Sequence, residues 1–255
     1  MITRYSVWLN GQGLQDIDPC VYVTDVQEDA PEESLTTVSG MRNGTRLIHR
    51  IRESLSVTVT FIIREYDTAR RKAVADRIRA WAQDGWLSVS DRPGQQLYVT
   101  CDRLPAVSSS LKWTDRLQLT FTAYERPFWL ETQPVTAAFS GNAGTVGIRP
   151  LGNMPCLLEG SISNASASVL NALTLSTGGA FFTFAPLNLA PGASLEISYD
   201  EKGLLHARIG DTPVLHLRTA ASADDLWLQP RENNTVSIEA DRAVSAVIRA
   251  RGVWR

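Results

Sequence analysis

Alternation of apolar and polar residues with a period of two runs through most of this chain, and it limits the fold to a β-rich architecture. Residues 54–63, S-L-S-V-T-V-T-F-I-I, combine this period with β-branched and aromatic side chains, and residues 117–124 repeat the pattern. Residues 87–90 and 97–101 flank the turn-forming sequence D-R-P-G at 91–94 and predict a hairpin. The first half of the chain is therefore expected to consist mainly of strands.

One segment has a helical period instead. Asp67 can cap its start by accepting hydrogen bonds from free backbone N–H groups, and Gly85 follows where a left-handed C-cap would end it. Its apolar residues form one stripe and its arginines lie mostly off that stripe: Val74, Ile78, Trp81 and Ala82, against Arg70, Arg71, Arg77 and Arg79. We expect one helix at about residues 68–83, inserted among strands, which is an α+β pattern and not a series of βαβ units.

The second half of the chain has a different texture. Residues 131–155 contain E-T-Q-P, S-G-N-A-G-T and R-P-L-G-N, which concentrate turn formers and indicate a junction. Short strands and no helix are expected after it, at residues 156–162, 170–175, 180–184, 194–199, 203–209, 213–218, 226–229, 235–239 and 244–251. Many short, evenly spaced strands favour a β-sandwich, so we predict two domains, 1–130 and 131–255.

Composition excludes several classes of protein. With 44% hydrophobic and 20% charged residues, the chain is expected to be globular and not disordered. The chain has 25 basic and 27 acidic side chains, so it lacks the excess of basic residues that is typical of a nucleic-acid-binding protein. No apolar run approaches a membrane span, and the first residues lack the apolar core of a signal peptide. The widely spaced Cys20, Cys101 and Cys156 are expected to be buried free thiols in a reducing cytoplasm.

Charges of opposite sign are segregated in the first domain, although residues 1–130 contain 16 basic and 16 acidic side chains. An acidic stretch, with Asp25, Glu28, Asp29, Glu32 and Glu33, is followed by a basic one, with Arg42, Arg46, Arg50 and Arg52. Two solvated loops or strand faces would explain the pattern. The alternative is that acidic and basic surfaces meet on neighbouring copies, in a head-to-tail contact that closes into a ring.

No combination of residues indicates an active site, and we expect no catalytic residues, cofactor or metal. His206 and His216 could face each other across a hairpin at Asp211, but two imidazoles fall short of the three or four ligands of a zinc site. No phosphate-binding loop, dinucleotide fingerprint or nucleophile motif is present. Among the tryptophans, whose default role is packing, Trp227 beside Asp224 and Asp225 is the best candidate for a platform that stacks on a sugar.

The order of features in residues 1–130 resembles the siphovirus-type distal tail protein family, also called the phage tail component domain. The motifs that carry the resemblance are the arginine-rich segment, the helix with R-I-R-A-W-A, the hairpin D-R-P-G-Q-Q-L-Y-V and the ending F-T-A-Y-E-R-P-F-W. The resemblance implies a mainly β chain, with a split β-barrel-like domain containing one helix, followed by a β-sandwich of galectin-like or carbohydrate-module-like shape.

The same resemblance implies a structural role in the virion tail of a long-tailed phage or prophage, for a protein made in the cytoplasm of the bacterial host. Copies would form a homo-oligomer, a hexameric ring, that joins the tail tube protein to the baseplate or tip hub protein. The alternative function is a carbohydrate-binding adhesion module for a host-surface glycan. Galectin-type sites combine His, Asn and Arg on adjacent strands, and the segments around His206 and His216 depart from this pattern because they lack the Asn.

Overall fold

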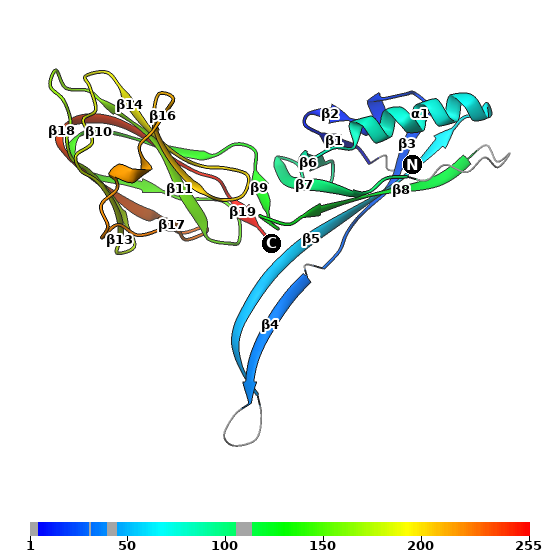
Figure 1. Cartoon of the computed structure of the whole chain (residues 1–255), viewed down its shortest axis with the longest axis horizontal. Helices are drawn as coiled ribbons and strands as arrows, with labels where there is room; N and C mark the ends of the chain where they lie inside the picture. Colours follow the sequence, from blue (N-terminus) through cyan, green and yellow to red (C-terminus); the bar gives the residue numbers. More distant parts are fainter. Residues whose placement is uncertain (1–4, 31, 40–44, 106–113) are drawn as a thin grey trace. The chain divides into compact units, whose positions relative to one another are not determined.

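The computed structural model describes residues 5–30, 32–39, 45–105 and 114–255. The chain forms two compact units that divide between residues 129 and 130. Both are built mainly from strands in curled sheets, and α1 (Thr68–Trp81) is the one α-helix in the described part of the chain (Figure 1). The expectation of a mainly β chain with a single helix is therefore confirmed.

The first unit contains one sheet with the strand order β2-β1-β6-β7-β8-β5-β3. Its strands are β1 (Val7–Leu9), β2 (Gln12–Gly13), β3 (Val21–Glu28), β4 (Glu32–Ser39), β5 (Thr45–Arg64), β6 (Gly85–Val89), β7 (Gln95–Arg103) and β8 (Thr114–Ala123), and a short 3-10 turn, η1, covers Leu14–Asp16. β6 and β7 are the hairpin predicted from the D-R-P-G turn, with Leu87 opposite Leu97.

Alternation along β5 produces the core of this unit. Every second residue from Leu55 to Ile63 is at most 3% exposed, and those from Leu55 to Phe61 each pair with an apolar residue of β8, as Phe61 does with Leu117 and Val57 with Phe121. Cross-strand neighbours on one face pack directly on each other, so this alternation specifies both the strand and its register. The strand predicted at 54–63 is confirmed, although β5 begins nine residues earlier.

The helix α1 packs its predicted stripe into the core. Asp67 caps it as expected, since its Oδ1 accepts a hydrogen bond of 2.9 Å from the Ala69 N–H. The helix ends at Trp81, two residues earlier than expected, and Gly85 is no C-cap but the first residue of β6. The prediction for Gly85 was wrong because its lack of a side chain serves another purpose: a Cβ there would collide with the side chain of Asn10.

The second unit is built around a long curled strand. Its strands are β10 (Val135–Ile148), β11 (Cys156–Asn164), β12 (Leu173–Thr177), β13 (Ala180–Phe184), β14 (Ser194–Tyr199), β15 (Leu205–Ile209), β16 (Thr212–Pro213), β17 (Trp227–Leu228), β18 (Asn234–Ala250) and β19 (Val253–Trp254), while β9 (Trp129–Glu131) lies at the division between units. One half of β18 pairs with β12 and the other half with β11, so the curled sheet continues around the core through β18.

Three expectations for the second unit were wrong. The turn-rich segment at 131–155 contains β10, which pairs with β18 along its whole length, and β18 itself is one strand where two were predicted. Gly141 and Gly144 break the propensity pattern, but the strand needs them, because the ring of Phe139 lies 2.8 Å from where a Cβ of Gly144 would be. The strand expected at 213–218 is not formed: β16 ends at Pro213, and Leu215–Leu217 is a 3-10 turn, η2.

Candidate interaction surfaces

A two-stranded ribbon, made of β4 and the first half of β5, is the most unusual element of the first unit (Figure 1). Residues 55–63 of β5 pair with β8 on one side and mostly with β3 on the other. Residues 45–54 pair only with β4 among the described strands. An isolated two-stranded hairpin is at best marginally stable in water.

Most of the charged residues singled out in the sequence lie on this ribbon. Glu32 and Glu33 are in β4, and Arg46, Arg50 and Arg52 are in β5, whereas Arg42 lies outside the described residues. The register sets Glu33 opposite Arg52 on the same ribbon.

The other two arginines of the ribbon have a different register. Arg50 stands opposite Leu35, and Arg46 stands opposite Val38. Neither of these opposing positions is acidic.

The acidic residues of β3 separate into two groups. Glu28 is held within the chain: its Oε2 accepts hydrogen bonds from Arg92 Nε at 2.9 Å and from Trp129 Nε1 at 3.2 Å. The Arg92 guanidinium also lies 5.0 Å from the centre of the Trp129 ring. Asp25 is half-buried, and Asp29 is exposed and accepts a hydrogen bond of 3.2 Å from Gln27. Asp29, with Asp25 beside it, is thus the freer part of the acidic stretch.

Sequence reasoning missed the Glu28 cluster. Arg92 lies in the β6–β7 turn, 64 residues from Glu28, and Trp129 lies 101 residues from it. The one available signal was Arg92 in the predicted hairpin turn, and an arginine in a turn does not indicate which residue it contacts. The cluster ties the end of β3 to that turn and to a tryptophan that is only 1% exposed.

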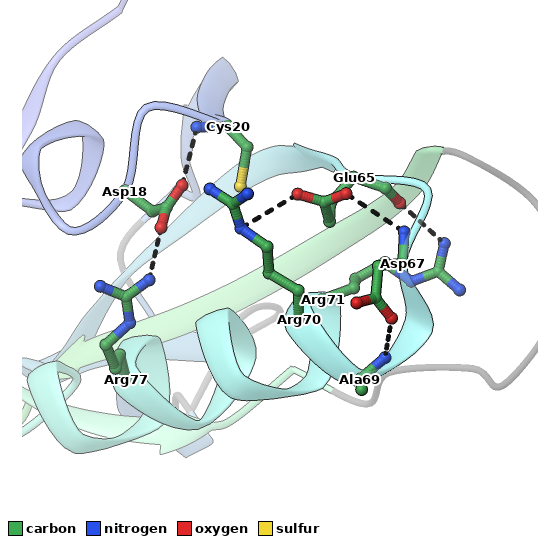
Figure 2. Close-up of polar contacts among 8 residues, drawn as sticks. All are labelled: Asp18, Cys20, Glu65, Asp67, Ala69, Arg70, Arg71 and Arg77. Atoms are coloured by element: carbon green, nitrogen blue, oxygen red, sulfur yellow. Dashed lines mark hydrogen bonds and ion pairs between the residues drawn. The ribbon is translucent and has the colours of Figure 1, made fainter.

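Polar contacts around α1 have a structural role (Figure 2). Arg77 of the helix pairs with Asp18, whose Oδ1 also accepts a hydrogen bond of 3.1 Å from the Cys20 N–H. Hydrogen bonding from Cys20, with support from Arg77, lowers the pKa of the Asp18 carboxyl to about 2. Arg71, expected off the buried stripe, is only 1% exposed and donates to the Glu65 carbonyl at 3.4 Å.

None of the three thiols has the character of a nucleophile. Burial, together with Asp18, raises the pKa of Cys20 to about 11, and burial raises the pKa of Cys156 to about 12. The pKa of Cys101 is also raised by burial. All three are free, but Cys20 and Cys101 are half-buried, so the expectation of complete burial was right only for Cys156.

The described residues also offer no metal centre: they contain no group of three or more His, Cys, Asp or Glu side chains that could hold an ion. His206 of β15 stands opposite Ser198, and its Nε2 lies 3.2 Å from Asp200, while His216 is part of η2. The hairpin at Asp211 therefore does not set the two histidines opposite each other. No described helix is long and apolar enough to cross a membrane.

Trp227 lies at a hollow in the second unit with a volume of about 490 Å³. Half of its side chain is exposed, 51%, whereas its neighbours Leu226 and Leu228 are fully buried. The hollow lies between the β12–β13 turn, β17 and the turn before β18. Asp224 and Asp225, which drew attention to Trp227 in the sequence, do not line this hollow, whereas Glu232 and Asn233 do.

Comparison with known proteins gives matches in structure alone. The sequence matches no protein-family model, and no curated protein matches it. The chain is similar to the Dit protein (gp 19.1) of phage SPP1, described as a paradigm of the hub adsorption apparatus in phages infecting Gram-positive bacteria. The TM-score is 0.73, at 10% identity over 97% of this chain and 98% of that chain.

Chains of the phage p2 baseplate in its activated conformation are also similar. The strontium-containing structure has a TM-score of 0.55 at 6% identity, over 97% of each chain. The calcium-containing structure has a TM-score of 0.55 at 7% identity, over 99% of this chain and 98% of that chain. The fold expected from the resemblance in sequence is thereby confirmed along nearly the whole chain.

Proposed function

We propose that this chain is a structural component of a phage tail, a ring protein at the distal end that joins the tail tube to the baseplate or tip complex. The observation that carries the proposal is the whole-chain similarity of fold to the SPP1 Dit protein, at a TM-score of 0.73. Both units take part in that similarity, because the match covers 97% of the chain. The similar chains come from a hub adsorption apparatus and a baseplate, which supports a structural role.

Ring formation gives the ribbon of β4 and β5 the partner that a two-stranded element requires. In a head-to-tail ring, a surface of one copy meets a different surface of the next copy, and the contact repeats until the ring closes. We assign Arg46 and Arg50 to one side of this contact, since the residues opposite them in the ribbon are apolar. Asp25 and Asp29 are assigned to the other side, and Glu28 contributes indirectly by holding the end of β3.

The remaining parts of the proposal follow from the resemblance in sequence. Six copies would close the ring, and the tail tube protein and the hub of the baseplate or tip would bind its two faces. The protein would be made in the cytoplasm of the bacterial host and then incorporated in the virion tail. Charge pairs would set the register between copies, while apolar strand faces would supply most of the affinity.

Charge reversal on the ribbon tests the ring contact. The double variant Arg46→Glu, Arg50→Glu should remain folded but shift from hexamer to monomer, because four units of charge change at a contact that depends on opposite signs. Light scattering coupled to size-exclusion chromatography, and electron microscopy of the same fractions, measure the assembly. Circular dichroism and thermal unfolding check that the fold is retained.

A matched control is Lys72→Glu, Arg242→Glu, which makes the same change in net charge at two exposed positions that are not part of the ribbon. This control should assemble like the wild type. A hexameric Arg46→Glu, Arg50→Glu variant would show that the contact is assigned to the wrong residues. A wild-type chain that stays monomeric even with its tail tube protein present would contradict the ring itself.

A further inference from the structure

The hollow at Trp227 has the chemistry of a small-molecule site, and none of the contacts described for the first unit involves it. Its lining combines one exposed aromatic ring with hydroxyl, amide and carboxylate groups, from Thr177, Gly178, Ala180, Trp227, Gln229, Glu232, Asn233, Asn234 and Thr235. The volume of about 490 Å³ falls in the range of ligand pockets in proteins. An aromatic face among a few convergent polar groups is the arrangement by which proteins hold amphipathic ligands.

The side chain of Trp227 is exposed, while its backbone is fixed by strand pairing. It forms β17 with Leu228 and pairs with Leu157 of β11, while the buried side chains of Leu226 and Leu228 anchor the segment on both sides. The backbone of Trp227 is thus fixed by its neighbours, and its side chain lines the hollow. A large aromatic side chain presented to solvent in this way carries binding energy to a ligand with an apolar face.

Asn234 shapes the wall of the hollow. Its amide group donates to the carbonyl oxygens of Gln229 and Glu232 at 2.9 and 3.0 Å, and its Oδ1 accepts from the Gln229 N–H at 2.8 Å. These bonds close the turn from Gln229 to Asn234, in which Arg231 has a positive φ of 60°. Asn234 is therefore occupied by the protein itself and acts as a positioning residue for the turn.

Three side chains of this turn are exposed and available to a ligand: Gln229, Glu232 and Asn233. They supply two amides, each of which can donate and accept hydrogen bonds, and one carboxylate that accepts them. The opposite rim is the β12–β13 turn at Gly178, where a Cβ would meet no atom within 4 Å. Gly178 therefore brings no side chain to this part of the lining.

We propose that this hollow binds a neutral pyranose sugar residue. The apolar face of the sugar ring would stack on Trp227, and its hydroxyl groups would exchange hydrogen bonds with Gln229, Asn233 and Glu232. The carboxylate of Glu232 makes the site unfavourable for uronic acids and other anionic sugars, because it repels a second negative charge bound in the same hollow. This inference does not depend on ring formation, since all the lining residues belong to the second unit of one chain.

Saturation-transfer NMR on the full-length protein tests the site with glucose, galactose, N-acetylglucosamine and, as the anionic probe, glucuronic acid. At least one neutral sugar should receive saturation, and Trp227→Ala should weaken its binding by about tenfold, the effect of one lost aromatic contact. Leu204→Ala is the control, because it also removes an exposed apolar side chain of the second unit, 59% exposed, that does not line the hollow. Thermal unfolding of each variant checks that the fold is unchanged.

Glu232→Gln tests the charge argument separately. This variant should retain the neutral sugar and gain binding of glucuronic acid, while Asn233→Ala should weaken the neutral sugar several-fold. The proposal is overturned if no neutral sugar receives saturation, or if Trp227→Ala binds as well as Leu204→Ala. Equal binding of glucuronic acid and neutral sugars by the wild type would also overturn it.

Discussion

Replacing Glu28 with alanine should destabilise the first unit by about 2 kcal/mol. Glu28 accepts hydrogen bonds from Trp129 at 3.2 Å and from Arg92 at 2.9 Å, and Trp129 is only 1% exposed. Without the carboxylate, the indole N–H loses its acceptor where water has little access, which costs about 1 to 1.5 kcal/mol. Loss of the partly exposed ion pair with Arg92 adds about 0.5 to 1 kcal/mol.

Differential scanning calorimetry of the full chain measures this effect. A loss of about 2 kcal/mol in a unit of this size lowers its Tm by roughly 6 to 8 °C. Glu28→Gln keeps an acceptor for Trp129 and loses only the charge, so it should cost about half as much. Asp76→Ala is the matched control, since its exposed carboxylate makes one ion pair with Arg79 on the surface of α1, and it should change the Tm by less than about 2 °C.

A double-mutant cycle of Glu28→Ala with Arg92→Met measures the interaction between Glu28 and Arg92 apart from their other contacts. If Glu28, Arg92 and Trp129 act together, the double variant should lose about 1 kcal/mol less stability than the sum of the losses of the two single variants. The reasoning is refuted if Glu28→Ala melts within about 1 °C of the wild type, or if Glu28→Gln is as damaging as Glu28→Ala. Either outcome would mean that the acceptor at Trp129 contributes little to the stability of the unit.

Two further predictions concern titration and thiol chemistry. The pKa of Asp18 is lowered from 3.8 to about 2, so its ionised form stabilises the fold above about pH 4, and this contribution is lost as the pH falls towards 2. Asp18→Asn should therefore reduce stability at pH 7 and flatten its decline in acid, as followed by urea unfolding at a series of pH values; an unchanged acid profile would contradict the assignment. Burial raises the pKa of Cys156 to about 12, so an aromatic disulfide reagent at pH 8 should modify it only on unfolding, as mapped by mass spectrometry; labelling at the rate of a free peptide thiol would refute this.

Local signals in the sequence were sufficient for the helix and for the central strands. A cap at Asp67 and an apolar stripe through Val74 and Ile78 depend on residues within a few turns of one another, so α1 followed directly. The core half of β5 also followed, because burial of one sheet face imposes a period of two on the residues that form it. The same reasoning missed β10, where Gly141 and Gly144 make room for the ring of Phe139 and resemble turn residues in sequence.

The candidate surfaces depended much more on contacts between distant residues. The sequence indicated that acidic and basic stretches follow each other, but the pairing of Glu33 with Arg52, and of Arg50 with Leu35, required the register of β4 on β5. Glu28 was expected to face another copy, yet the structure engages it with Arg92 of its own chain. Trp227 was selected for its polar neighbours, and the true neighbours in the hollow proved to be a different set, which includes Thr177, 50 residues away.

The sequence by itself determined the β-rich class, the single helix, the hairpin at residues 91–94 and the absence of known catalytic motifs, because these properties depend on propensity and period over short stretches. Only the tertiary structure decided which charges are satisfied within the chain, which strands continue through glycine-rich segments, and where an exposed aromatic ring meets a hollow. Such contacts depend on strand register and on curling of the sheet. Both are set when the whole core packs, and neither is encoded in neighbouring residues.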